Sequence, residues 1–403
     1  MSSKVRRALE EVGRRTGVCF RIVFADGSSY QSREGTPDTV ITFHRKSAEL
    51  NVLFFGHIGL LESYFAGGAD IDGDIAAAFR AGMDAGFADC PGLMVRLRNR
   101  WHEWRFSNGS VAQAKVNARF HYGLGTEFFR YWLDSPTMTY TCAYWREGTA
   151  TLEQAQRNKL DHVCRKLRLQ PGESMADIGC GWGGLMFHAH EHFGARATGY
   201  NTTTEQVAAL SEEIRRRGLD DVLQVREADF REVRGQYDKC ASVGVLEHAG
   251  RDQLPEAIRC LAECVKPGGL GVLHFIGHVG VSETEFFVRK HIFPGGWIPS
   301  LAQTIQLMER HGLDILDIEN LRRHYALTLD EWAARFDRCW DDIRRLDSSR
   351  FNEEFYRKWR SYLYACAEMF RSPNTRTHLF QITFSKGNVG YEYPMSRNYL
   401  YAG

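Results

Sequence analysis

The sequence predicts an α/β protein, with a mostly parallel sheet covered by helices on both faces in its larger part and a smaller α+β domain at its N-terminus. Between residues 150 and 400, short apolar runs alternate with stretches of helical periodicity, as strands and helices do in such a sheet. A glycine-rich stretch at residues 176–184 joins a strand-like run to a helix-like run. Ligands of this fold class bind beyond the carboxyl ends of the strands, so functional residues are expected there.

The first 92 residues are predicted to form the small domain. A short amphipathic helix is expected at residues 5–12, followed by strands at 18–24 and 39–43. Residues 60–68, Leu-Leu-Glu-Ser-Tyr-Phe-Ala-Gly-Gly, are expected to begin a helical region rich in small residues. A small domain with a core of its own is favoured here over a second catalytic site.

Capping and turn signals place the elements of the larger part. Three capping-box patterns begin at Thr151, Thr203 and Thr328, and each is expected to open a helix. Further helices are predicted at 185–193 and 257–264, and further strands at 195–200, 222–225, 239–245, 270–275 and 379–384. Two late helices carry apolar stripes at helical spacing, which are expected to be core or the wall of a substrate pocket. These stripes are Trp332, Phe336, Trp340 and Ile343, and then Phe355, Trp359, Leu363, Cys366 and Phe370.

Composition narrows the class of protein. Of the 403 residues, 43% are apolar and 25% charged, which is ordinary for a globular protein. The net charge of +1 gives no overall attraction to nucleic acid. The ten cysteines, Cys90 among them, contain no C-x-x-C pair, and no run of about 18 apolar residues occurs. We therefore expect a reduced, cytosolic protein without a membrane span.

Residues 93–120 are predicted to be a basic linker or helical segment. Six cations interleave there with apolar residues, and Glu103 is the only acidic residue between 93 and 120. A solvated linker helix explains this composition, and so does a surface that rests on anionic lipid headgroups with tryptophans at the interface. RNA binding lacks a recognisable module. The residues concerned are Arg96, Arg98, Arg100, Arg105, Lys115 and Arg119, with Leu93, Leu97, Trp101, Trp104 and Phe106.

The glycine-rich stretch favours S-adenosylmethionine (SAM) as cofactor. Gly179, Gly181 and Gly184 fit G-x-G-x-x-G, a pattern that dinucleotide enzymes share. Asp177 stands two residues before the first glycine, at the expected end of the strand. A carboxylate there can hold an ammonium group, which SAM carries and NAD does not. SAM is therefore the favoured cofactor, although the glycines alone leave a dinucleotide open.

Polar residues gather at the expected ends of four further strands. Asn201 stands where a dinucleotide enzyme places a ribose-binding acid, and Asp229 suits an adenine amino group. Glu247 follows the next strand with His248, and His274 lies at the end of the fifth. So many polar groups at neighbouring strand ends indicate a site, with a satisfied hydrogen-bond network as the alternative. No metal site is predicted, because no spacing suits zinc.

Five segments together resemble the cyclopropane-fatty-acyl-phospholipid synthase family. Similarity to that family extends over about residues 120–386 and more faintly over 61–68. The resemblance implies a Rossmann-like class I methyltransferase sheet with helical insertions at residues 121–403. The segments are Tyr140-Thr141-Cys142-Ala143-Tyr144-Trp145, 177–184, 245–250, 273–277 and His291-Ile292-Phe293-Pro294-Gly295-Gly296.

The resemblance implies transfer of the SAM methyl carbon to a cis double bond of an unsaturated phospholipid acyl chain, forming a cyclopropane ring. Family members hold a bicarbonate ion as base, and the matching residues are Cys142, Glu247, His274, Ile276 and Tyr325. Glu247 would be protonated or would accept the bicarbonate hydroxyl. Tyr144, Trp145 and Phe275 are candidates to stabilise positive charge on the acyl chain. Contacts to SAM would come from Tyr140, Thr141, Asp177, Gly179, Gly181, Gly183, Asn201, Gln206 and Asp229.

Departures from the family pattern keep other products open. Gly123 and Thr126 replace an aspartate and an asparagine, and Asn201 replaces a threonine. The alternatives are methyl-branched chains, methylation of sphingolipids or amines, or a lipid-binding protein without catalysis. We expect a protein peripheral to the inner, cytoplasmic membrane surface, with unsaturated phospholipid and an anionic lipid surface as partners and no nucleic acid. A homodimer stays open.

Overall fold

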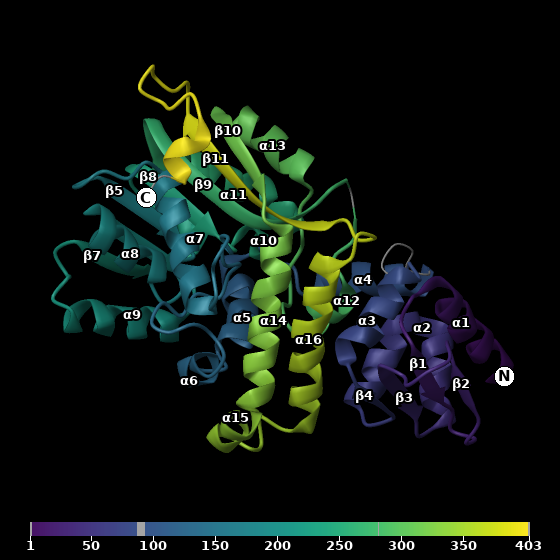
Figure 1. Cartoon of the computed structure of the whole chain (residues 1–403). Coiled ribbons are helices and arrows are strands. Elements are labelled where there is room, and N and C mark those ends of the chain that lie inside the picture. Colours follow the sequence, from purple (N-terminus) through teal and green to yellow (C-terminus); the bar gives the residue numbers. More distant parts are fainter. Residues whose placement is uncertain (1, 87–92, 281, 402–403) are drawn as a thin grey trace. The chain divides into compact units, whose positions relative to one another are not determined.

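The structure is a computed structural model that describes residues 2–86, 93–280 and 282–401 (Figure 1). Cys90 lies outside the described residues. The chain folds as two compact units, and each unit is built from three separate stretches. Unit 1 comprises Met1–Arg105, Glu285–Ile292 and Leu329–Thr375, and unit 2 comprises Phe106–Thr284, Phe293–Thr328 and Arg376–Gly403.

Compactness divides the chain differently from the three-part division expected from the sequence. The first crossing between units falls after Arg105, inside the segment 93–120 that was expected to be one linker. Residues 329–375, expected to belong to the catalytic part, are compact with the N-terminal residues. The expected boundaries at 92 and 120 stay predictions about independent folding.

Unit 1 contains a four-stranded sheet in the order β2-β1-β3-β4. The expected strands at 18–24 and 39–43 correspond to β1 and β3, and the parallel register pairs Ile22 with Ile41. Both residues are buried and belong to the core of the unit. The strands are β1 (Phe20–Val23), β2 (Ser29–Gln31), β3 (Thr39–Phe43) and β4 (Ala69–Gly73).

The helices of unit 1 come from all three of its stretches of chain. The first stretch supplies α1 (Ser2–Arg15), α2 (Lys46–Phe65), α3 (Ile75–Asp84) and α4 (Leu93–Arg105). The others supply α12 (Phe286–His291), the later part of α14 (Arg322–Arg338), α15 (Trp340–Leu346) and α16 (Glu353–Arg371).

Residues 60–68 end a helix, so the expectation that they begin one is wrong. The helix α2 already starts at Lys46, and Gly56 interrupts it with a φ of 57°. Gly67 adopts a φ of 66°, a left-handed conformation that suits glycine and stops the helix. The Gly68 amide then donates to the Ser63 carbonyl, which satisfies a group at the helix end.

Unit 2 contains a seven-stranded sheet in the order β10-β11-β9-β8-β5-β6-β7. The five strands from β9 to β7 in that order run parallel, whereas β11 is antiparallel to both β9 and β10. The expected mostly parallel sheet is therefore confirmed. The strands are β5 (Ser174–Ile178), β6 (Arg196–Asn201), β7 (Leu223–Glu227), β8 (Tyr237–Val243), β9 (Val265–His278), β10 (Leu313–Asn320) and β11 (Thr377–Lys386).

Helices cover both faces of this sheet (Figure 1). One core cluster joins the sheet to α7 (Leu152–Lys166), α8 (Gly184–Phe193) and α9 (Thr204–Arg216). The other joins it to α11 (Leu254–Cys264) and α13 (Leu301–Arg310). The short helices α5 (Val111–Tyr122), α6 (Thr126–Arg130) and α10 (Leu246–Ala249) complete the unit, with 3₁₀ turns at Phe230–Glu232, Arg251–Gln253 and Arg397–Leu400.

Of the three expected capping boxes, the threonine hydroxyl caps the helix only at Thr151, which accepts from the Gln154 amide. Thr203 stands at the N-cap of α9, so the expected helix start is confirmed, although its hydroxyl makes no capping bond and its amide donates to the Asn201 side-chain oxygen. Thr328 lies inside α14, where its hydroxyl donates to the His324 carbonyl at 2.7 Å. The expectation that a helix begins at Thr328 is therefore wrong.

The two late apolar stripes pack against each other as core, which confirms the first of their two interpretations. α14 and α16 run side by side in Figure 1, and Phe336 stacks on Tyr356 with ring centroids 5.9 Å apart. Trp332, Phe336, Ile343 and Leu363 are fully buried. None of the helices in the described part of the chain is long and apolar enough to cross a membrane.

Candidate active site

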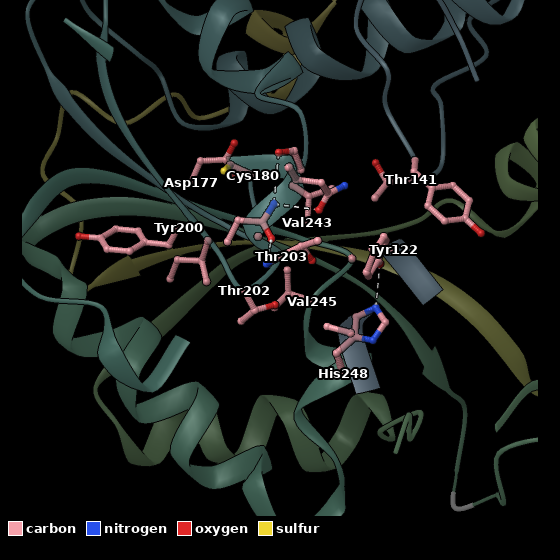
Figure 2. Close-up of a pocket in the computed structure, with 18 of the residues that line it drawn as sticks. Tyr122, Thr141, Asp177, Cys180, Tyr200, Thr202, Thr203, Val243, Val245 and His248 are labelled. Atoms are coloured by element: carbon pink, nitrogen blue, oxygen red, sulfur yellow. Dashed lines mark hydrogen bonds between the residues drawn. The ribbon is translucent and has the colours of Figure 1, made fainter. Parts of the chain in front are cut away.

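A pocket of about 160 Å³ lies beyond the carboxyl ends of the parallel strands of unit 2 (Figure 2). It is bordered by the ends of β5, β6 and β8, by the start of α8 and by α5 and α7. Eight of the nine residues predicted to contact SAM line this pocket. They are Tyr140, Thr141, Asp177, Gly179, Gly181, Asn201, Gln206 and Asp229, whereas Gly183 lies one residue before the lining residue Gly184.

The glycine turn after β5 leaves room that side chains would fill. Gly179 has a φ of 81°, and a Cβ there would approach Val245 Cγ2 to 2.1 Å. A Cβ on Gly184 would come within 2.7 Å of the Thr137 carbonyl oxygen. Because such contacts are too short, glycine is required at these positions, and the backbone can approach a ligand closely. The expected tight turn between strand and helix is confirmed.

Asn201 and Gln206 hold each other at the end of β6. The Asn201 amide donates to Gln206 Oε1 at 3.0 Å and to the Gly181 carbonyl at 3.2 Å. Its own oxygen accepts from the Thr203 amide. This bonding fixes the asparagine that replaces the acid of dinucleotide enzymes, and it ties the strand end to the glycine turn.

Asp229 is engaged by a neighbour of its own chain. Its carboxylate pairs with the Arg231 guanidinium at 2.6 Å and caps the 3₁₀ turn that starts at Phe230. Arg231 also reaches the Asn108 carbonyl at 3.1 Å. The side chain that was predicted to bind an adenine amino group therefore already accepts two charge-assisted bonds, and its role toward a ligand stays a prediction.

Asp177 and Lys159 are two buried ionisable residues that line the pocket. Asp177 is 3% exposed, and burial raises its pKa to about 7 while Lys159 opposes that rise. Lys159 is 2% exposed, burial lowers its pKa to about 8, and its ammonium donates to the Thr141 hydroxyl at 3.0 Å. A buried carboxyl that is only half ionised near neutral pH would gain from a ligand ammonium.

Sequence reasoning missed Lys159 and its neighbour Gln156. Both stand on the inner face of α7, where Gln156 donates to the carbonyls of Thr139 and Thr141 at 3.1 and 2.9 Å. Together they hold the loop that carries Tyr140 and Thr141. A signal was present, since polar residues interrupt the apolar face of the helix that directly precedes the glycine turn.

Glu247, His274 and Ile276 lie at the ends of β8 and β9. Glu247 Oε1 accepts from the Ile276 amide at 2.5 Å, and its other oxygen is buried without a hydrogen-bond partner. Burial raises the pKa of Glu247 to about 7 and lowers that of His274 to about 3. His274 Nδ1 is 3.0 Å from the Gln381 amide, and its Nε2 is also buried and unpartnered. Two orphaned polar atoms thus stand beside the cofactor pocket.

The Cys142 thiol and the Tyr325 backbone amide both lie next to the Leu321 carbonyl, directly after the end of β10. The Cys142 thiol donates to the Ala143 carbonyl at 3.2 Å and lies 4.0 Å from the Leu321 carbonyl, which also accepts from the Tyr325 amide. Burial raises the pKa of the thiol above its usual range. The Leu321 amide donates to Leu379, whose register partner on β9 is Ile276. Backbone contacts thus connect Cys142 and the start of α14, the helix that carries Tyr325, to Ile276 on β9, whereas the joint role of the five predicted residues around an anion stays a prediction.

The aromatic candidates divide between the two faces of the sheet. Phe275 is fully buried in the core cluster that contains α11, on the opposite face of β9 from His274 and Ile276. Its expected role beside a reacting acyl chain is therefore wrong. Tyr144 stacks between His162 and His324, with ring centroids 4.2 and 4.7 Å away. Trp145 donates its indole N–H to the Thr328 hydroxyl, so Thr328 anchors the loop that carries Trp145.

Tyr122 and His248 form a further buried pair at the pocket, joined by a dashed line in Figure 2. The Tyr122 hydroxyl is 3.2 Å from His248 Nε2. Burial lowers the pKa of His248 to about 4, and burial with the nearby Glu247 raises that of Tyr122. A neutral imidazole here accepts from the tyrosine hydroxyl.

The cradle fits SAM and the strand edge fits a small anion. The glycine turn leaves space for the cofactor backbone, and Asp177 offers a carboxylate to an ammonium. Glu247 Oε2 and His274 Nε2 are both without a partner. A carboxylate oxygen can accept from a hydroxyl, and a protonated ring nitrogen or carboxyl can donate to an anion. Among the described residues, no group of three His, Cys, Asp or Glu side chains could hold a metal ion.

Comparison with known proteins identifies the class and the family. A crystal structure of a mycolic acid cyclopropane synthase complexed with SAH and CTAB has a TM-score of 0.63 and 30% identity, covering 68% of this chain and 98% of that chain. The fold is that of class I SAM methyltransferases, and the protein is a SAM-dependent methyltransferase. The family model described as mycolic acid cyclopropane synthetase matches residues 110–382, and the chain belongs to this family.

Two curated relatives extend the similarity into the N-terminal region. A probable fatty acid methyltransferase of Pseudomonas putida is 32% identical over 351 residues, which cover 84% of this chain and 85% of the relative. The cyclopropane-fatty-acyl-phospholipid synthase of Escherichia coli strain K12 is 33% identical over 340 residues, which cover 83% of this chain and 85% of the relative. The resemblance inferred from the sequence motifs is confirmed.

Proposed function

We propose that the enzyme transfers the methyl carbon of SAM to a cis double bond of an unsaturated phospholipid acyl chain and forms a cyclopropane ring. The observation that carries this proposal is the pair of orphaned polar atoms, Glu247 Oε2 and His274 Nε2, beside a pocket with a SAM cradle. Ring closure requires a base that removes a proton from the new methyl group, and an anion held by these two atoms would be such a base. The similarity to the cyclopropane-fatty-acyl-phospholipid synthase of Escherichia coli supports the phospholipid substrate.

The residues of the chain would orient the reactants and hold the base. Bound SAM supplies an electrophilic methyl group, and bound bicarbonate supplies the base. Asp177 holds the ammonium of the cofactor, and Thr141, fixed by Lys159, holds its carboxylate. Glu247, His274, Cys142 and Tyr325 surround the anion. Orientation of this kind can remove roughly 7–11 kcal/mol from the barrier.

Helix α4 supports a role at a membrane surface. Its residues Leu97, Trp101 and Trp104 are 57%, 59% and 74% exposed and recur at spacings of four and three, which puts them on one side of the helix. The side chain of Arg100 is exposed beside them. We propose that this face rests on anionic lipid at the cytoplasmic side of the inner membrane, with tryptophans at headgroup level.

Arg98, one of the six cations in the expected basic segment, packs against aromatic rings. The Arg98 guanidinium stacks 4.0 Å from the Phe286 ring centroid and 5.3 Å from that of Phe55, and burial lowers its pKa. Arg98 is therefore a packing residue, and it does not belong to the exposed face of α4 that is proposed to meet the lipid. The side chain of Arg96 lies outside the described side chains.

Mass spectrometry of host lipids tests the proposed reaction. Expression of the chain should add one methylene unit to phospholipids with cis-unsaturated chains, and NMR of the product should show a ring instead of a methyl branch. Expression of the Glu247→Ala variant should leave the lipids unchanged although the purified variant still binds SAM. The exposed carboxylate variant Glu263→Ala is the matched control and should keep activity. Full activity of Glu247→Ala would remove that residue from the mechanism.

A further inference from the structure

Unit 1 contains a second cavity of about 160 Å³ that the proposed reaction does not use. Its walls come from the sheet of the unit, from α1, α2 and α3, and from α12 and α16. Leu9, Ile22, Ile41, Phe79, Met83 and Met369 are among the side chains that form these walls.

The apolar character of the cavity decides which ligands can occupy it. Protein interiors are packed to the density of organic crystals, so a cavity of this size in a core is unusual. An apolar void does not hold water well, because water needs two or more polar partners. Thr39 is one of the few polar residues in the wall, and its hydroxyl already donates to the Asp72 carbonyl at 3.2 Å. The cavity therefore suits an alkyl chain.

One polar pair in the wall marks where a headgroup can sit. His57 Nε2 is 3.1 Å from Glu285 Oε1, and the two side chains are 31% and 33% exposed, so the pair reaches solvent. Burial lowers the pKa of His57, but the charge and hydrogen bond of the Glu285 carboxylate raise it more. A zwitterionic headgroup has an anionic group that can face the imidazole and a cationic group that can face the Glu285 oxygen, whereas an anionic headgroup meets that oxygen with like charge.

The surface of the same unit offers a route from a bilayer. Phe54 is 66% exposed, and it lies two residues before Gly56, where α2 is interrupted next to His57. The exposed apolar face of α4 is close in the same unit, because the Arg289 side chain of α12 donates to the Asn99 carbonyl of α4 at 2.7 Å. Helix α12 thus contacts α4 and also lines the cavity, and Glu285 just before it contacts His57 beside the interruption in α2.

We propose that the unit 1 cavity is a second lipid site that binds one alkyl chain of a zwitterionic phospholipid, separate from the chain that reacts. The enzyme would hold a bilayer lipid by this chain while unit 2 acts on another. The proposal rests on the proposed function only for the presence of phospholipid. It requires no double bond and no turnover in unit 1.

Photo-crosslinking with a saturated probe tests the site. The full-length enzyme is saturated with SAH and incubated with a palmitoyl lysophosphatidylethanolamine that carries a diazirine near the end of its chain. After irradiation, labelled peptides are mapped by mass spectrometry. Label is expected on α3 and α16, at residues such as Met83 and Met369. Absence of label from both helices would overturn the proposal.

Cavity-filling variants locate the probe independently. Ala78 and Ala365 line the cavity, whereas Ala76, on the same helix as Ala78, does not. Ala78→Phe and Ala365→Phe should reduce labelling of α3 and α16 at least tenfold, and Ala76→Phe should leave it unchanged. SAM binding and thermal unfolding of each variant establish that it is folded. Equal labelling of wild type and folded, filled variants would place the chain elsewhere and overturn the proposal.

The probe separates this site from the proposed reaction. Because its chain is saturated, loss or persistence of labelling says nothing about ring formation. Labelled α3 and α16 in an enzyme that leaves unsaturated vesicles unchanged would support the lipid site and overturn the reaction. A cyclopropane product from an enzyme without that label would overturn the lipid site alone.

Discussion

Helices α7 and α4 are both rich in charged and polar residues, but α7 buries several of its polar side chains whereas α4 exposes several of its apolar ones. α7 buries Gln156, Lys159, His162 and Lys166, whereas the described part of α4 exposes Leu97, Trp101 and Trp104 and buries Asn99 and His102. Composition alone would make either helix a solvated one. The difference lies in what each polar or apolar group meets when the chain folds.

Buried polar groups on α7 have partners that belong to a site, and exposed apolar groups on α4 need a partner from outside the chain. Lys159 and Gln156 hold the loop that borders the cofactor pocket. Lys166 and His162 hold Glu319 at 2.8 and 2.7 Å, and this carboxylate accepts from Tyr144 as well. Burying a charge is costly unless it is paired, so such residues indicate function or its scaffold. A contiguous exposed apolar face indicates a surface that is covered in use.

Replacing Lys159 by methionine should have the largest effect on the α7 side of this comparison. The Thr141 hydroxyl loses its donor, which costs about 2 kcal/mol, or roughly thirtyfold in SAM affinity measured by calorimetry. Lys166→Met on the same helix is the matched control. Because Lys166 binds Glu319, its replacement should lower the thermal stability but leave the SAM affinity unchanged. Equal losses of SAM affinity would show that any buried cation of α7 has this effect.

Removing the two tryptophans of α4 should have the next largest effect. Trp101→Ala with Trp104→Ala should weaken binding to anionic vesicles about tenfold, since the two rings together contribute about 1.4 kcal/mol when they are partly buried in the interface. SAM affinity should not change. Tyr391→Ala, which removes a fully exposed aromatic side chain of unit 2, is the control in the pelleting assay. Unchanged pelleting of the double variant would return α4 to a solvated helix.

The raised pKa of Asp177 predicts a pH dependence of SAM binding. Burial raises the pKa of Asp177 to about 7, so below pH 7 most free enzyme carries a proton there that the SAM ammonium must displace. SAM affinity should therefore fall by up to about tenfold per pH unit below 7 and level off above it. The stability of the free enzyme changes in the other direction. Because the pKa of Asp177 is higher in the folded protein than in an unfolded chain, the free energy of unfolding falls as the pH rises towards 7.

Calorimetry from pH 5.5 to 8.5 measures the binding part of this prediction. Asp177→Asn should weaken SAM binding and remove its pH dependence in this range. A pH-independent affinity of the wild type would mean that the cofactor ammonium does not meet Asp177.

Arg100 should have the smallest effect and should sharpen the role of α4. Its loss in Arg100→Gln costs about 1 kcal/mol at an anionic surface, or roughly fivefold in vesicle affinity, and the difference should shrink at high salt. Arg98→Gln is the control, because this residue stacks on Phe286 and should change stability without changing the salt dependence. A larger salt effect from Arg98 than from Arg100 would reverse the assignment of the two residues.

Sequence periodicity was sufficient for most of the sheet of unit 2, because buried parallel strands are continuous apolar runs. It missed β10, whose run Leu-Asp-Ile-Leu-Asp-Ile-Glu-Asn alternates acids with aliphatics at the sheet edge. It also misplaced the cap at Thr328. A capping pattern describes only four residues, whereas the Ala143 amide that donates to the Thr328 hydroxyl is 185 residues away in the sequence.

The cofactor pocket could be predicted from local motifs more completely than the rest of the site. The glycine turn, Asp177 and Asn201 follow strand ends that periodicity identifies. Lys159 was missed because its partner Thr141 is 18 residues away, in a loop without regular structure. Phe275 was misjudged because neighbouring residues on a strand point to opposite faces, so its neighbours His274 and Ile276 share a face that it does not.

The most direct test of the proposed reaction combines the purified enzyme, SAM labelled with ¹³C in its methyl group and vesicles of cis-unsaturated phospholipid containing anionic lipid. Mass spectrometry and NMR of the recovered lipid should show one labelled methylene unit in a cyclopropane ring on the acyl chain. Unaltered lipid from an enzyme that binds SAM and pellets with the vesicles would contradict the proposal that this sheet edge performs ring formation.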